Sequence, residues 1–93
     1  MSIVVRFNPI NVDRTKYEET MRRLEQEGLW PNPAGLELHV AFGDEGSLKV
    51  SEIWASGEQF QAQAEKLMPV LTDLGIEFAG DPEVFEVQNL VKS

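Results

Sequence analysis

The middle of the chain reads Leu36-Glu-Leu-His-Val-Ala-Phe-Gly-Asp-Glu-Gly-Ser-Leu-Lys-Val-Ser-Glu-Ile-Trp54. Apolar and polar residues alternate on both sides of Asp44-Glu-Gly46, which is typical of two half-buried strands joined by a tight turn. A three-residue loop that ends in a left-handed glycine suits this spacing. The opposite pairs that such a loop predicts, all on one apolar face, are Leu36 with Trp54, Val40 with Val50, and Phe42 with Leu48.

Regular elements are also expected before this hairpin. Ile3–Phe7 is rich in β-branched and aromatic residues and predicts a strand that Asn8-Pro9 ends. Thr15-x-x-Glu18 has the pattern of a capping box at a helix start, with Asp13 as a rival N-cap. The face that this helix would bury carries, at helical spacing, Tyr17, Met21 and Leu24.

A second helix and a last strand are expected after the hairpin. Ser56-x-x-Gln59 is another capping box, and the apolar residues at helical spacing after its start are Phe60, Ala64, Leu67, Leu71 and Leu74. Pro69 lies inside this stretch and cannot donate to the carbonyl of Glu65, which predicts a kink or a broken helix. The last strand is predicted at Val84–Val91, after a turn.

The element order is therefore β-α-β-β-α-β, which predicts an α+β, ferredoxin-like fold. A single domain spanning residues 1–93 fits the length of the chain. Because both crossovers are right-handed, both helices should cover one face of a four-stranded antiparallel sheet. By alternation, His39 should lie on the opposite face, with Glu37 and Ala41. The residues expected on the helix side are Val5, Phe7, Leu38, Val40, Val50 and Trp54.

The composition narrows the class of partner. The chain has 16 acidic and 8 basic residues, hence a net charge of −8, and it lacks the clusters of Lys and Arg that nucleic acids and anionic membranes attract. It has no cysteine, which excludes disulfides, thiolate nucleophiles and cysteine-based metal sites. No signal peptide or membrane-spanning stretch is visible, so a cytoplasmic location is expected. We expect no cofactor, and no metal either, since Glu37 and His39 would be only two ligands.

The end of the third strand and the start of the second helix read Glu52-Ile-Trp-Ala-Ser-Gly-Glu-Gln-Phe60. With the element order, this Glu-x-Trp strand end, polar turn and acidic, aromatic helix start resembles the dimeric α+β barrel superfamily, particularly its antibiotic-biosynthesis-monooxygenase-like branch. The resemblance covers nearly the whole chain. It implies a homodimer in which the sheets of two subunits pack face to face, through the face expected to carry Val4, His39 and Ile53.

The resemblance also bears on site residues. Relatives that degrade haem carry an asparagine at the end of the first strand, and Asn8 matches that position. They also carry an aromatic residue and a histidine on the second helix, and quinol-oxidising relatives tend to have a histidine in its first turns. Gln63 occupies this place, and the second helix has no histidine. The best-known catalytic sets of the family are therefore incomplete here.

Two residues are candidates for catalysis. Glu52 is expected on the apolar face, where a carboxyl group can act as a general acid or base. A bulge that turns it outward, or an ion pair with Arg6 or Lys49, would remove that role. Asn8 would donate a hydrogen bond, although alternation points it away from the helices. His39 is interpreted as a partly exposed or interface histidine.

A ligand pocket between the helices and the sheet would have mainly aromatic walls, with Trp54 as a stacking surface or simply a core residue. Trp30, beside a Pro-rich connection, would form its rim or cap the first helix. The residues expected to bind a ligand are Phe7, Tyr17, Met21, Trp54, Phe60 and Gln63. Three functions stay open: binding of a small apolar or aromatic molecule, cofactor-independent monooxygenation of a quinol-like aromatic, and a structural or interaction role without a ligand. The sequence leaves open whether the protein is an enzyme.

Overall fold

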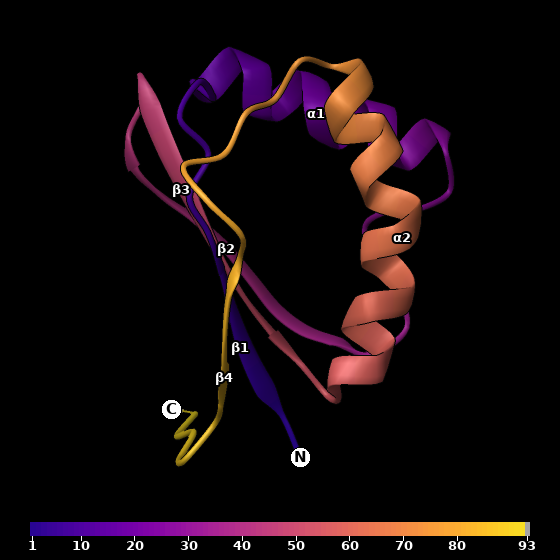
Figure 1. Ribbon diagram of the computed structural model, residues 1–93, viewed down its shortest axis with the longest axis vertical. Coiled ribbons are helices and arrows are strands. Elements are labelled where there is room, and N and C mark those ends of the chain that lie inside the picture. The colour runs from indigo at the N-terminus through magenta and orange to yellow at the C-terminus, as the bar shows by residue number, and fades with distance from the viewer. Residues whose placement is uncertain (93) are drawn as a thin grey trace.

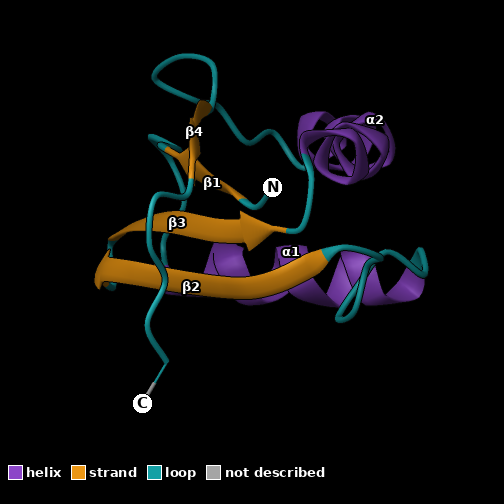
Figure 2. Ribbon diagram, turned by 90° about the horizontal axis from the view of Figure 1, so that it is seen from below, coloured by secondary structure: helices purple, strands orange, loops and turns teal. Residues whose placement is uncertain are grey.

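The computed structural model describes residues 1–92 and consists of a four-stranded antiparallel sheet and two helices. The strand order is β2-β3-β1-β4. Both helices lie on the same side of the sheet (Figure 1), and Figure 2, which views α2 almost end-on, shows that they run in different directions. The expected ferredoxin-like fold is confirmed. In chain order the elements are β1 (Ile3–Phe7), α1 (Arg14–Gln26), β2 (Leu36–Asp44), β3 (Ser47–Trp54), α2 (Gly57–Asp73) and β4 (Glu83–Glu86).

The helices begin at side chains that cap them. Asp13 is the N-cap of α1, and its carboxylate accepts a hydrogen bond from the Lys16 N–H at 2.7 Å. Of the two N-cap candidates in the sequence, Asp13 and not Thr15 is therefore the cap. Ser56 caps α2 and accepts from the Gln59 N–H at 3.2 Å. Each cap satisfies a backbone donor that the first helical turn leaves free.

The second helix runs without a break through Pro69, so the expectation of a broken helix is wrong, while a kink at this position stays a prediction. The residues that follow the proline, Val70 and Leu71, are both buried. Packing of an apolar face supplies most of the stability of a helix in a protein, and here it outweighs the loss of one backbone hydrogen bond.

The last strand is shorter than the sequence predicts, ending at Glu86 instead of Val91. It pairs with β1, and the register places Glu86 opposite Ile3, the first residue of that strand. One further hydrogen bond joins the Val87 N–H to the Ser2 carbonyl at 3.0 Å. The strand pairing stops there because β1 does not extend further.

The hairpin differs from the prediction in its register. Leu36 pairs with Trp54 as expected, but the register shifts between Leu36 and Leu38, and Asp44 pairs with Ser47 across a two-residue turn. An extra residue in one strand of a pair reverses the alternation of the residues beyond it. As a result Leu38, Val40 and Phe42 lie opposite Ile53, Ser51 and Lys49, so the pairs of Val40 with Val50 and Phe42 with Leu48 are wrong.

The shifted register exchanges the two faces of β2. His39 and Ala41 take the helix-side positions expected for Leu38 and Val40, and His39 lies opposite Glu52. His39 was predicted on the outer face with Val4 and Ile53. That prediction is wrong for the histidine and correct for the other two residues. The apolar residues of the outer face, here called the outer patch, are Val4, Leu38, Val40, Phe42, Ile53 and Phe85.

The core lies between the sheet and α2. Its buried apolar cluster consists of Ile3, Val5, Trp54 and Phe60. Val5 is 0% and Trp54 1% exposed, so the tryptophan is a core residue as well as a wall of the cavity described below. Within residues 1–92, no helix is long and apolar enough to cross a membrane.

Candidate active site

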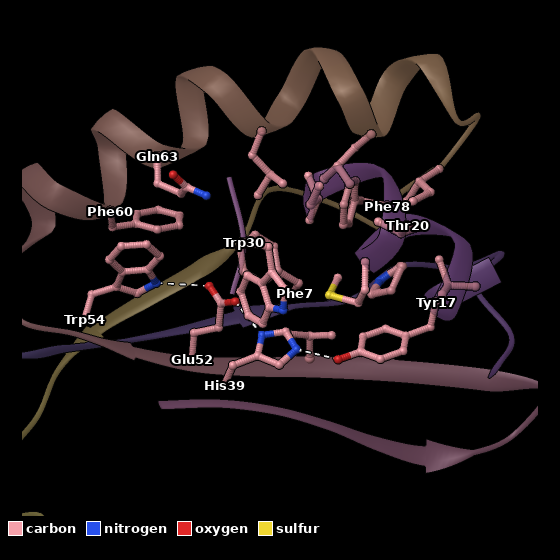
Figure 3. A pocket seen from close by; sticks show the side chains of 18 residues that line it. Phe7, Tyr17, Thr20, Trp30, His39, Glu52, Trp54, Phe60, Gln63 and Phe78 are labelled. Atoms are coloured by element: carbon pink, nitrogen blue, oxygen red, sulfur yellow. Dashed lines mark hydrogen bonds and ion pairs between the residues drawn. The ribbon is translucent and has the colours of Figure 1, made fainter. Parts of the chain in front are cut away.

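A cavity lies between the two helices and the inner face of the sheet (Figure 3). Its volume is about 80 Å³ and it is partly open to solvent, which gives room for several water molecules. Its walls are mostly apolar. Among the described residues that line it, Glu52 is the one carboxylate and there is no lysine or arginine. The aromatic residues of its walls are Phe7, Tyr17, Trp30, Trp54, Phe60 and Phe78.

A series of hydrogen bonds joins four side chains of this cavity. Tyr17 Oη lies 2.8 Å from His39 Nε2, and His39 Nδ1 lies 2.6 Å from Glu52 Oε2. The second carboxylate oxygen, Glu52 Oε1, accepts from Trp54 Nε1 at 3.0 Å. Figure 3 shows the four side chains in this order along the cavity floor. We refer to the first three residues as the Tyr17–His39–Glu52 triad.

Three elements bring the triad together. His39 on β2 and Glu52 on β3 are directly opposite each other in the sheet, so their side chains point to the same face. Trp54 lies two residues beyond Glu52 on β3, which places it on that face as well. Tyr17, in the first turn of α1, reaches down to the histidine from above the sheet.

The hydrogen-bond partners define which ring nitrogen carries the proton when the histidine is neutral. An ionised carboxylate only accepts hydrogen bonds, so His39 Nδ1 carries a proton and donates it to Glu52. In the neutral imidazole, Nε2 then accepts the hydroxyl proton of Tyr17. This is the arrangement by which a carboxylate holds a histidine base in one tautomer.

Water has little access to this pair. The side chains of His39 and Glu52 are 12% and 9% exposed. The indole of Trp30 meets the imidazole edge-on, with ring centroids 4.6 Å apart. Electrostatic interactions strengthen where water is excluded, so the carboxylate acts on the histidine with little screening.

Tyr17 is a neutral phenol in this site. Burial raises the pKa of Tyr17 above its ordinary value of 10.0, the negative charge of Glu52 raises it further, and Arg14 opposes the rise. The hydroxyl group therefore keeps its proton at physiological pH.

Glu52 neither turns outward at a bulge nor pairs with Arg6 or Lys49, the two alternatives that the sequence left open. Glu52 is buried on the helix side, because the bulge lies in β2 and leaves the alternation of β3 intact. Lys49 instead donates to the Pro9 carbonyl at 3.1 Å, and Arg6 lies opposite Ser51 on the outer face. The residue that donates a hydrogen bond to the carboxylate from the neighbouring strand is His39, which the sequence analysis placed on the other face.

All six predicted wall residues line the cavity, namely Phe7, Tyr17, Met21, Trp54, Phe60 and Gln63; that they bind a ligand stays a prediction. Gln63 also ties the segment before Trp30 to α2, since its Nε2 donates to the Leu29 carbonyl at 2.9 Å. Asn8 is exposed, and its carbonyl accepts from the Ala79 N–H at 3.0 Å. Its neighbours Phe7 and Pro9 line the cavity in its place.

Two features of this site were not predicted from the sequence. His39 was expected on the wrong face, because strict alternation contains no signal for the bulge near Glu37. Thr20 and Phe78 were not expected among the cavity walls that they line. Thr20 follows Tyr17 by three residues on α1, so helical spacing could have found it. In the described part of the chain, no group of three or more His, Cys, Asp or Glu side chains is placed to hold a metal ion.

Comparisons with known protein families and with curated protein sequences find no match. Solved structures, in contrast, match over nearly the whole chain. SnoaB, a cofactor-independent oxygenase from Streptomyces nogalater, superposes with a TM-score of 0.65 at 14% identity over 99% of this chain and 96% of that chain. A Deinococcus radiodurans protein assigned as an antibiotic biosynthesis monooxygenase gives 0.61 at 12% identity, covering 100% and 98%. The chain has the fold of the antibiotic biosynthesis monooxygenases.

A third structure with this monooxygenase fold adds a different activity. The heme-degrading protein Rv3592 from Mycobacterium tuberculosis superposes with a TM-score of 0.56 at 25% identity, covering 99% of this chain and 100% of that chain. One backbone thus carries more than one chemistry, so the function of the present chain has to be argued from its own cavity.

Proposed function

We propose that this protein binds a small, uncharged hydroxyaromatic molecule in its cavity and oxidises it with molecular oxygen, without a cofactor. The observation that carries the proposal is the Tyr17–His39–Glu52 triad inside a cavity with otherwise mainly aromatic and apolar walls. Aromatic walls alone suit a binding protein. A histidine oriented by a buried carboxylate adds a proton acceptor, which binding alone does not require.

The proposed chemistry needs no electron donor besides the substrate. In the reaction of a one-ring quinol with O₂, one oxygen atom enters a ring C–H bond and the other leaves as water, so the products are a hydroxyquinone and water. The quinol supplies all four electrons that O₂ takes up. Removal of a hydroxyl proton makes the ring a better electron donor, and this is the step for which a positioned base is useful. The fold of the cofactor-independent oxygenase SnoaB supports this choice.

The dimensions of the cavity favour a small substrate. A volume of about 80 Å³ leaves room for no more than a single ring, which would extend into the opening of the cavity, and the edge-on contact of Trp30 with His39 narrows the space over the triad. A wider aromatic system would have to displace Trp30 or Met21. We therefore expect activity to fall as rings are added to the substrate.

Oxygen uptake with a panel of one-ring quinols tests the proposal. We expect one O₂ consumed per quinol, and one atom of labelled oxygen in the hydroxyquinone. His39→Gln should lower the rate by roughly 10²–10⁴-fold, the usual contribution of a general base. Glu65→Gln, on the exposed side of α2, is the matched control and should leave the rate unchanged.

A protein that consumes no oxygen beyond the spontaneous oxidation of the quinols would contradict the oxygenase proposal.

The second candidate, a non-catalytic binder, rests on the cavity itself. Quinols that quench the fluorescence of Trp30 and Trp54 without oxygen uptake would establish binding and rule out turnover.

We also propose that two copies of the chain pair through the outer patch. Four of its residues are strongly exposed for apolar side chains: Leu38 is 44%, Val40 42%, Phe42 42% and Phe85 52% exposed. Leu38, Val40 and Phe42 lie on β2 and Phe85 lies on β4, the two edge strands of the sheet. Ile53 on β3 and Val4 on β1 lie between them and connect Leu38 to Phe85 in one row, and contiguous apolar surface of this kind is typical of an interface. A stable face-to-face dimer should bury about 1,600 Å² or more in total.

A further inference from the structure

Two charge states of the triad satisfy the same hydrogen bonds. In the first, His39 is neutral and its Nε2 accepts the Tyr17 hydroxyl proton. In the second, His39 is an imidazolium whose Nε2–H donates to the Tyr17 oxygen, and the Tyr17 hydroxyl hydrogen is free to turn toward the cavity. In both states Nδ1–H donates to Glu52. The second state differs from the first by one added proton, and the site can accommodate that proton without breaking a contact.

We propose that the cavity binds a weakly acidic hydroxyaromatic as its anion, with the ligand's proton passed through Tyr17 and held on His39. This rests on the proposed function, since it specifies the substrate class and first step of that reaction. The ligand O–H bond breaks, its proton joins the Tyr17 oxygen, and the Tyr17 proton moves to His39 Nε2. The electron pair of the broken bond stays on the ligand oxygen, which then accepts a hydrogen bond from Tyr17. Nothing is oxidised or reduced in this step.

The charges around the triad favour this transfer. Glu52 Oε2, 2.6 Å from Nδ1, stabilises the imidazolium that forms. Trp54 donates to the other oxygen of the same carboxylate and keeps it in place. Tyr17 on α1, His39 on β2 and Glu52 on β3 are the titratable groups of the described cavity, while α2 contributes the uncharged Gln63.

The same charges define which ligands are excluded. Within the described residues that line the cavity, no lysine or arginine is present to pair with an anion. A ligand that enters with a carboxylate or phosphate group would face Glu52 without a counter-ion. A neutral hydroxyaromatic creates its own counter-ion, because its proton converts His39 into a cation. The site therefore selects ligands that arrive neutral and ionise after binding.

Tyr17 is suited to pass a proton on but not to lose one permanently. Burial and the charge of Glu52 raise the pKa of Tyr17, so the tyrosinate form is disfavoured at rest. The hydroxyl can give its proton to His39 only as it receives another from the ligand. Tyr17 touches the ligand in this scheme, whereas Glu52 is a positioning residue that acts through His39.

The ionisation of a chromogenic ligand tests the proposal directly. 4-Nitrophenol has one ring, and its absorption distinguishes phenol from phenolate. At about one pH unit below its pKa in water, roughly a tenth of the free probe is ionised. We expect the bound probe to be mainly phenolate, a shift of at least about tenfold in its ionisation equilibrium. A bound probe that keeps the phenol spectrum would overturn the proposal and indicate a purely structural hydrogen-bond network.

Matched ligands and variants test whether ionisation of the bound probe depends on the triad. 4-Nitroanisole, which cannot ionise, should bind at least about tenfold more weakly than 4-nitrophenol; equal affinity would contradict the proposal. Tyr17→Phe and His39→Gln should abolish the ionisation of bound probe, and Glu65→Gln should preserve it. Thermal melts of each variant show whether it is folded, and the wild-type measurement does not depend on any variant.

Failure of this proposal is distinguishable from failure of the proposed function. If the probe ionises on binding but no quinol promotes oxygen uptake, the anion site stands and the oxygenase proposal is wrong. If quinols are oxidised by His39→Gln at the wild-type rate, the oxygenase proposal stands and the proton-holding role of His39 is overturned.

Discussion

Glu52 accepts hydrogen bonds on both carboxylate oxygens, from His39 and from Trp54. A buried carboxylate without such partners would be strongly destabilising. The sequence placed Glu52 and Trp54 on the buried face correctly, since β3 keeps the alternation of polar and apolar residues. It could not reveal the partner of the carboxylate, because that depends on the register of the neighbouring strand.

The hydrogen bond from Trp54 to Glu52 should contribute measurably to stability. Trp54→Phe keeps an aromatic ring in the core but removes the donor, and we expect a loss of about 1–3 kcal/mol in the free energy of unfolding. Trp54→Ala also leaves a cavity and should cost about 3–5 kcal/mol. Urea denaturation measures both values. Trp30→Phe, at a half-buried position, is the control. If it lowers the free energy of unfolding as much as Trp54→Phe does, the loss in Trp54→Phe does not come from the hydrogen bond to Glu52.

The titration of Tyr17, the one tyrosine of the chain, should differ between the folded and unfolded states. Its pKa is raised above 10.0 in the folded protein, so around and above pH 10 the folded state binds more protons than the unfolded state. Stability should therefore fall as the pH rises through this range. Absorption of the tyrosinate should show a midpoint above 10 in buffer and a return to about 10 in denaturant. Equal midpoints would show that Tyr17 is not held in the site.

Among the helices and strands, β2 has the greatest effect on the site, because its register decides on which face of the sheet His39 lies. The hairpin, its strands and the pair of Leu36 with Trp54 were predicted correctly, because apolar alternation is a local signal. The predicted three-residue loop is wrong, since Asp44 pairs with Ser47 and Gly46 does not have a positive φ. The bulge after Leu36 is not local, since it depends on how the two strands pair over their full length. A shift of one residue moved His39 from the outer face to the cavity and transferred Leu38 and Val40 to the outer face.

The observed turn makes a prediction about two glycines of the hairpin. Gly43 has a φ of +107°, and a Cβ there would lie 2.9 Å from the Ser47 carbonyl oxygen, whereas a Cβ at Gly46 would meet nothing within 4 Å. Gly43→Ala should therefore destabilise the protein by more than about 1 kcal/mol, and Gly46→Ala should have a small effect. Thermal or urea denaturation of the two variants decides between this turn and the predicted three-residue loop, for which Gly46 would be the sensitive position.

The whole molecule presents two different faces of one sheet. The inner face carries the cavity and the triad, and the outer face carries the outer patch. The fold was predictable from element order and the Glu52–Phe60 segment, and structural matches across nearly the full chain confirm it. The outer patch is more apolar than predicted, because the register shift adds three residues of β2 to it: Leu38, Val40 and Phe42.

The proposed dimer predicts that a charge on the outer patch dissociates the protein. Val40→Asp introduces a carboxylate at a 42% exposed position of the patch and should shift the protein toward monomer. Ile10→Asp adds the same charge at a 57% exposed position outside the patch and should leave the dimer unchanged. Light scattering at micromolar concentration measures both. A monomeric wild-type protein under these conditions would refute the dimer.

The central claim is that the histidine of this chain is held inside the cavity between Glu52 and Tyr17. Nitrogen-15 NMR of the imidazole tests it most directly, since the chain has a single histidine and its signals need not be distinguished from those of other histidines. The structure predicts a protonated Nδ1 in the ligand-free protein near neutral pH, and a loss of this preference in Glu52→Gln. An imidazole with its proton on Nε2 and an unprotonated Nδ1 would contradict the account, because Glu52 would then have no donor at 2.6 Å.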